Sequence, residues 1–219
     1  VQLNIGFIKA ACATEKVRGN LALMAGTYAN ANLAAEPGVL KNIFEANAGI
    51  KISKTRNLWV DAGVFSSHIG FESAVGKDCQ TLTRSILADN SPYYESGAKL
   101  SYTTDDGRWL VSGLLLNGWQ RIQRPAGNST PAFGHQITFK PNSKTTLNSS
   151  SFIGSDTPDS TRLMRYFHNL YGIFQISGRA GLIAGFDIGA QQSGLRDGSF
   201  HIWYTPVVIA QIKTSKKVR

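Results

Sequence analysis

The sequence predicts an all-β protein, an antiparallel up-and-down transmembrane β-barrel that is incomplete, and three observations predict it. Segments in which apolar and polar side chains alternate recur along the chain, each about 9 to 11 residues long, as a tilted membrane strand requires. The connections between these segments are short and long in turn. Charged residues make up only 17% of the chain, below the roughly 25% of typical soluble domains.

The alternation is clearest in residues 182–191, where Leu182, Phe186 and Ile188 fall on one face and Asp187 and Gln191 on the other. Residues 45–53, 58–64 and 94–102 show the same pattern. One face of each segment thus carries charges, amides and glycines, which is costly in a packed core but suits a water-filled lumen. The opposite face is expected to contact lipid.

Eleven such segments are expected to be strands: residues 1–11, 19–28, 44–54, 58–67, 93–104, 108–119, 132–140, 145–154, 165–177, 180–191 and 200–213. We expect them to form one β-barrel domain over residues 1–219. Pro206 conflicts with a central strand because it lacks a backbone N–H, so we expect it at the outer end of its strand, where pairing stops.

Loop length follows parity. Short turns at 14–16, 55–56, 105–107, 141–143 and 178–179 alternate with longer stretches at 29–43, 68–92, 120–131, 155–164 and 192–199. Short periplasmic turns and longer outer loops are typical of bacterial outer-membrane barrels, whereas a β-sandwich has no reason to sort loops in this way. Residues 36–44, in one of the longer loops, are compatible with either a short helix or a turn.

Several classes of function are disfavoured. No apolar run reaches the 18 to 20 or so residues of a membrane-spanning helix. The net charge of +9 fits nucleic acid, anionic lipid or an anion-selective pore, but the basic residues are scattered and do not interleave with stacking aromatics, so we expect no nucleic-acid partner.

Catalytic, metal and cofactor sites are not expected either. The four histidines have no partner at metal-ligand spacing, and Cys12 and Cys79 read as two unrelated thiols. The serines at 149–151 lie within a predicted strand without the context of a nucleophile, and are interpreted as lumen and small-residue packing. The protein is therefore not expected to be an enzyme.

A family resemblance joins these observations at residues 60–72 (VDAGVFSSHIGFE), which resemble the OmpL-like β-barrel porins: a strand ends in Asp-x-Gly-x-Phe, and a Gly-x-Glu turn opens a long inward loop. The resemblance continues through 92–100 (PYYESGAKL), 114–119 (LLLNGW) and 134–136 (GHQ), and it covers most of residues 20–212. It implies an outer-membrane location and a channel role, and it brings no catalytic residues.

The strand number departs from the family pattern. A bacterial single-chain barrel has an even number of strands, and eleven are expected here. Members of the family are longer, so we expect the chain to be truncated at the C-terminus, with the N-terminal edge also open to question. An unclosed barrel would leave unpaired backbone groups in lipid, which is very costly.

The leading hypothesis is a porin-like channel of the outer membrane of a Gram-negative cell, for passive diffusion of small hydrophilic solutes, with the loop 68–92 folded inward to narrow the lumen. Its partners are outer-membrane lipid and these solutes, and the sequence makes no prediction about oligomeric state.

Charges at inward positions and in the loop are the predicted pore-lining residues, because facing charges filter solutes by charge and size: Lys51, Asp61, Glu72, Arg84, Glu95, Lys99 and Asp187. An equally weighted interpretation makes many of these charges pairs that stiffen the wall. The alternative function is an extracellular all-β carbohydrate-binding module, such as a sandwich that binds carbohydrate on exposed aromatics like Trp119 and Trp203.

Overall fold

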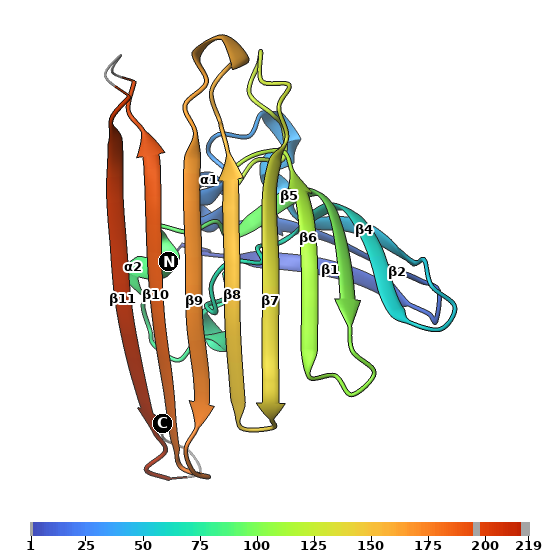
Figure 1. Ribbon diagram of the computed structural model, residues 1–219, viewed down its shortest axis with the longest axis vertical. Coiled ribbons are helices and arrows are strands. Elements are labelled where there is room, and N and C mark those ends of the chain that lie inside the picture. The colour runs from blue at the N-terminus through green and yellow to red at the C-terminus, as the bar shows by residue number, and fades with distance from the viewer. Residues whose placement is uncertain (1, 195–197, 216–219) are drawn as a thin grey trace.

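Eleven strands form one antiparallel sheet in the computed structural model, which describes residues 2–194 and 198–215 (Figure 1). Their order across the sheet is their order in the sequence. All eleven predicted strands are confirmed, although residue 1 of the first predicted segment lies outside the described residues. The strands are β1 Gly6–Ala13, β2 Val17–Ala25, β3 Ile43–Lys51, β4 Asn57–Ser66, β5 Tyr94–Thr103, β6 Trp109–Leu116, β7 Ala132–Asn142, β8 Thr145–Gly154, β9 Arg165–Gln175, β10 Ala180–Gln192 and β11 Phe200–Ile212.

The helices are short and lie in the longer connections. They are α1 Thr27–Asn32, η1 Gly38–Asn42, η2 Gly76–Asp78, α2 Ile86–Asp89 and η3 Asp159–Thr161, of which η1 is the short helix left open at 36–44. Among the described residues, no helix has the length and apolar character needed to cross a membrane. The alternation of short turns and longer loops is confirmed, and Figure 1 shows β7 and β8 joined by a tight turn at the end opposite the longer loops.

The sheet has two chemically different faces. We call the face covered by residues 67–93 the inner face and the opposite one the outer face. In β8, Asn148, Ser150 and Phe152 are buried on the inner face, whereas Leu147 and Ile153 are exposed on the outer face. Exposed apolar side chains recur at outer positions in most of the other strands, and they include Ile8, Leu21, Ile50, Leu100, Val111, Leu115, Phe133, Leu170, Phe186 and Val208.

A cluster of polar side chains, two histidines and two serines, interrupts this apolar outer face at β7–β9. His135 and His168 both stand opposite Ser151 in the register, and their rings lie 5.8 Å apart. Ser151 Oγ lies 2.5 Å from His135 Nδ1, and Ser149 Oγ lies 3.3 Å from His168 Nε2. Of the three serines interpreted as lumen and small-residue packing, Ser150 lies on the inner face, whereas alternation turns Ser149 and Ser151 to the outer face.

A glycine pair lies between β4 and β5 where a side chain would not fit. Gly63 and Gly97 face each other with φ of 124° and 153°, conformations that side chains with a Cβ rarely adopt. A Cβ at either position would also collide with a backbone carbonyl of the adjacent strand. The predicted alternation fails just beyond this glycine pair, because consecutive Val64 and Phe65 are both buried.

The sheet is open along two edges. Among the described residues, β1 pairs only with β2 and β11 only with β10, so these strands do not close a barrel. Pro206 lies in the middle of β11 opposite Phe186, and its predicted place at the outer end is wrong. The reason is that β11 is an edge strand, where a missing N–H can face the unpaired side.

Candidate functional site

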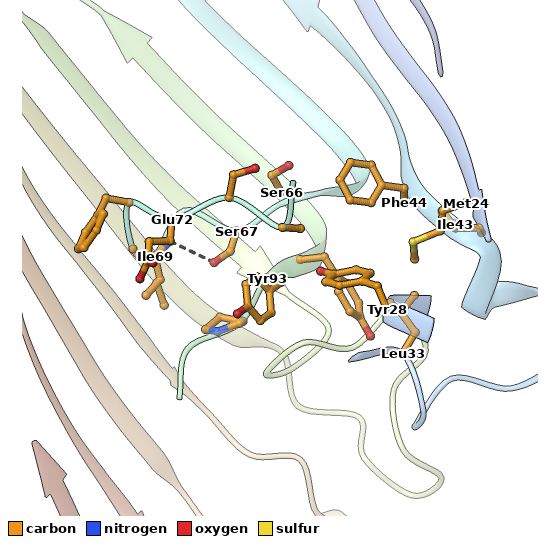
Figure 2. A pocket seen from close by; sticks show the side chains of 16 residues that line it. Met24, Tyr28, Leu33, Ile43, Phe44, Ser66, Ser67, Ile69, Glu72 and Tyr93 are labelled. Carbon is orange, nitrogen blue, oxygen red and sulfur yellow. Dashed lines mark hydrogen bonds between the residues drawn. The ribbon is translucent and has the colours of Figure 1, made fainter. Parts of the chain in front are cut away.

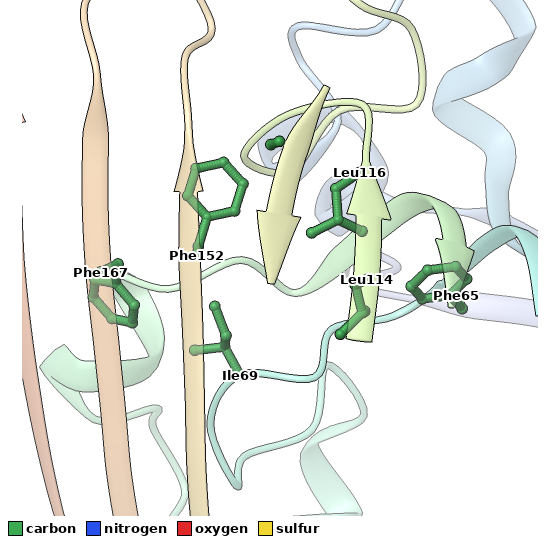
Figure 3. Packing of buried hydrophobic residues seen from close by; sticks show 7 residues of the cluster. Phe65, Ile69, Leu114, Leu116, Phe152 and Phe167 are labelled. Carbon is green, nitrogen blue, oxygen red and sulfur yellow. The ribbon is translucent and has the colours of Figure 1, made fainter. Parts of the chain in front are cut away.

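The inserted segment, residues 67–93 between β4 and β5, crosses the inner face toward β8–β11. Ile69 near its start is buried against Phe152 and Phe167, as Figure 3 shows. Further along, the backbone N–H of Gly70 donates to Asn169 Oδ1 at 3.2 Å, and α2 contacts β11. The segment is thus held on the wall opposite the strands that it connects.

His68 forms the most buried polar anchor of the inserted segment. Its Nδ1 lies 2.6 Å from Glu95 Oε2 on β5, and its Nε2 lies 2.9 Å from the carbonyl oxygen of Ser151 on β8. A His68 with a proton on each ring nitrogen can donate to both of these oxygens. Burial opposes this charge, yet the Glu95 carboxylate outweighs burial, and the pKa of His68 is raised.

The wall is shaped to receive this imidazole. Ser150 Oγ donates to the carbonyl of His68 at 2.8 Å. Gly134 on β7 leaves the space that the ring occupies, because a Cβ there would lie 2.8 Å from His68 Nε2. Glu95 Oε1 is buried and has no hydrogen-bond partner among the described residues, so the carboxylate depends on His68 for compensation.

Two of the predicted pore-lining charges fix the shape of the inserted segment itself. The backbone N–H and the hydroxyl of Ser85 both donate to the Glu72 carboxylate. Arg84 donates to the carbonyl oxygens of Ser73 at 2.7 Å and Ala74 at 3.1 Å. Glu72 and Arg84 do not pair with each other, and both lie in the segment that crosses the inner face.

A charged cluster lies on the inner face of β2, β4 and β5. Arg18 donates to both carboxylate oxygens of Asp61, at 2.6 and 2.5 Å, and its guanidinium lies 4.3 Å from the centroid of the Trp59 ring. Lys99 is the register partner of Asp61, and its ammonium lies 4.9 Å from the centroid of the Phe65 ring. The structure therefore brings Asp61 and Lys99 together, as alternation predicts for one face.

Arg18 is the residue of this cluster that the sequence analysis missed. The predicted second strand began at residue 19, two positions too late, because β2 begins at Val17. The alternation of Arg18, Asn20 and Ala22 was the available signal. Lys9 on β1 and Glu45 on β3 form a second missed pair across the intervening strand β2, with 2.5 Å between Nζ and Oε2.

The remaining predicted residues lie apart from the cluster. Asp187 on β10 is buried and accepts a hydrogen bond of 2.5 Å from Asn169 Nδ2, so Asn169 links it to the inserted segment at Gly70. Lys51 is half-buried at the end of β3 beside the short turns, opposite Trp59 in the register. The described residues contain no group of three or more metal-ligating side chains that could hold a metal ion.

A cavity of about 210 Å³ lies where the root of the inserted segment meets α1 and β3 (Figure 2). Tyr28 and Tyr93 meet edge to face there, with ring centroids 5.9 Å apart. Burial raises the pKa of Tyr93 to about 12, so its neutral hydroxyl donates to Asp89 Oδ1 at 3.4 Å. The tyrosine rings that line this cavity pack α1 against the inserted segment.

A single up-and-down sheet with an apolar outer face, a charged inner face and a segment folded across that inner face defines a porin-like β-barrel protein. Comparison with family models gives a match over residues 1–219 to the family described as Putative beta-barrel porin-2, OmpL-like, and the chain belongs to this family. Comparison with curated proteins and with solved structures gave no match. Membership supports a porin-like role in coarse terms, and suggests an outer-membrane protein and a non-enzymatic one.

Proposed function

We propose that this protein is a channel of the outer membrane of a Gram-negative cell through which small hydrophilic solutes diffuse passively. The observation that carries the proposal is the inserted segment, which is anchored by His68 and Ile69 to the wall opposite its root. A segment that spans a lumen in this way narrows it and sets the size of the solutes that pass.

The charges of the inner face support the same proposal. Asp61 with Arg18, and Lys99 beside them, place both signs of charge on one stretch of wall. Charges of both signs create a local field that discriminates weakly among solutes, without a deep binding site for one ion. The predicted role of Lys51, Asp61, Glu72, Arg84, Glu95, Lys99 and Asp187 as pore-lining residues is part of this proposal. Glu95 and Asp187 are buried, so these two would act on the lumen through the position of the inserted segment.

A closed wall is a requirement of the proposal. We propose that further strands pair with β1 and β11 in lipid, since unpaired strand edges in hydrocarbon would cost several kcal/mol for each unsatisfied group. β11 is an edge only among the described residues, and a strand paired with its open side would lack one ladder hydrogen bond at Pro206. The alternative function assumed a β-sandwich, and the observed strands instead lie in one sheet in sequence order.

The test is ion conductance of the full-length natural protein in planar bilayers. We expect discrete channels whose conductance and ion selectivity change in the variants D61N, R84Q and E95Q. Asp105, an exposed residue of a short turn, provides the matched control D105N, which should leave both properties unchanged. Protein that inserts and shows heat-modifiable electrophoretic mobility but never conducts would refute the channel; unchanged conductance and selectivity in all three variants would refute the pore-lining assignment.

A further inference from the structure

A second cavity, of about 410 Å³, opens at the long-loop end of the inner face. It lies between the end of α2 in the inserted segment, the chain that follows β6, and the wall of β9–β11. Its volume falls within the range of about 300 to 1,000 Å³ that is usual for small-molecule sites. Its lining includes Asp89, Tyr93, Trp119, Gln120, Arg165 and Trp203.

Two indole rings line this cavity, and a row of aromatic rings on the wall connects them. Trp119 meets Phe152 and Phe167 edge to face at 5.0 and 4.9 Å, and the Phe167 ring lies 6.3 Å from that of Trp203. Gly189 underlies Trp203, because any Cβ there would collide with the indole. Both indoles are half-buried, so packing fixes their positions while part of each ring faces the cavity.

The polar groups of the cavity are held in place as firmly as the rings. Arg165 stacks over Trp119, with 4.9 Å from its guanidinium to the ring centroid, and donates to Gln191 Oε1 at 2.8 Å. Gln120 accepts from the backbone N–H of Tyr93 at 2.8 Å and donates to the carbonyl of Asn32 at 3.0 Å.

Gln120 also adopts a φ of 55°. Such a conformation is uncommon outside glycine and costs free energy, so the surrounding contacts must enforce it. Strained residues of this kind cluster at ligand-binding sites, where fixed geometry serves recognition.

These features together match one class of ligand. Flat indole faces pack against the apolar C–H face of a pyranose ring, whereas amides, a guanidinium and a carboxylate bond its hydroxyl groups. Asp89 and Arg165 are the charged groups among the lining residues, and their charges cancel, so the cavity offers an ion little net attraction.

We propose that this cavity is a binding subsite for a neutral saccharide of one or two rings at the outer mouth of the channel. This inference rests on the proposed channel function, because the cavity lies on the inner face beside the inserted segment. A sugar held against Trp119 and Trp203 occupies the route into the lumen and obstructs the flow of ions while it is bound.

The experiment measures block of ion current through single channels of the full-length protein by glucose and by maltose. We expect concentration-dependent block, with the half-blocking concentration raised about tenfold or more by W119A and by W203A. Trp109 supplies the matched control W109A, because it stacks on Phe139 at the short-turn end, and this variant should block like the wild type. The exposed residue Asp89 lies outside the row of rings formed by Trp119, Phe152, Phe167 and Trp203, so D89A leaves that row in place while it removes the acceptor of the Tyr93 hydroxyl; weaker block is also expected in this variant.

The outcomes separate the two proposals. Absence of any ion current would refute the channel function itself. A normal ion current with no block by either sugar, or with block unchanged in W119A, W203A and D89A, would overturn the saccharide subsite and leave the channel intact. Block by sodium glutamate at concentrations where maltose has no effect would overturn the ligand class.

Discussion

Removal of the His68 imidazole is predicted to release the inserted segment from the inner face. In the variant H68A, the Glu95 carboxylate loses the group that lies 2.6 Å from its Oε2, and its Oε1 is already without a partner among the described residues. Both side chains are almost fully buried, at 2% and 0% exposure, so water does not replace the lost interaction.

The magnitude follows from this burial. Breaking a buried ion pair by removing one partner costs about 3 to 5 kcal/mol, since an uncompensated charge remains. Each 1.4 kcal/mol or so is a factor of ten in population. At the lower end of this range, the detached form of the inserted segment should therefore become about a hundredfold more populated.

Labelling of Cys79 by a maleimide gives the assay, because Cys79 lies within the inserted segment with its thiol 3.3 Å from the carbonyl oxygen of Ser73. The background variant C12S leaves Cys79 as the reactive thiol. Cys79 is half-buried, so the attached form contributes a background rate, and the expected result is a faster labelling rate in H68A, with about a hundredfold as the upper limit set by the detached population. His201 is exposed on β11, and H201A is the matched control, with no change expected.

A second control separates loss of the pair from loss of bulk. In H68L/E95L both charged partners are replaced by apolar groups, and such a replacement can be nearly neutral, so labelling should return most of the way to the wild-type rate. Equal labelling rates in the wild type and H68A would refute the view that this pair anchors the segment.

Three further predictions concern the same face of the sheet. The variant G134V should displace His68, because the new Cβ would lie 2.8 Å from His68 Nε2. The Cys79 thiol is therefore expected to be labelled as fast in G134V as in H68A, and labelling at the wild-type rate would contradict the tight fit. The folded pKa of His68 is raised, so its stabilisation of the attached segment is fully present below its unfolded pKa near 6.5 and is lost as pH rises through the folded pKa. The labelling rate of Cys79, divided by the rate in H68L/E95L to remove the effect of thiol ionisation, should therefore increase as pH rises through the folded pKa. A ratio that does not change with pH would argue against a cationic His68. The variant R18Q removes the cation that bonds both oxygens of Asp61, so the wall becomes more negative there. The reversal potential in a KCl gradient should shift toward cation selectivity. A shift toward anion selectivity would show that Asp61 does not face the permeating ions.

The sequence determined the strands and the sides of many of their residues, because both depend on local pattern. A tilted strand of fixed length must alternate its side chains, so Asp61 and Lys99 could be assigned to one face before the pairing was known. The alternation of loop lengths likewise marked the two ends of the sheet. These properties need no knowledge of distant contacts.

Partners across the sheet were decided by the tertiary structure. The path of the inserted segment depends on where Ile69 and His68 meet β8 and β9, more than 80 residues away for the contact of His68 with Ser151. No local pattern encodes such a contact, so the cation that compensates Glu95 was not predicted. Arg18 was missed for the simpler reason that the predicted strand began two residues late.

Sheet order also decided two features that pattern alone misread. Pro206 is tolerated in mid-strand because β11 is an edge, and the edge position of a strand is known only once all pairings are known. The serines at 149–151 divide between the two faces of the sheet. Ser149 and Ser151 lie on the outer face, where they hydrogen-bond with His168 on β9 and His135 on β7. Period-two alternation thus determined the wall of this protein, whereas the contacts that cross its inner face arise from segments brought together only when the sheet curves.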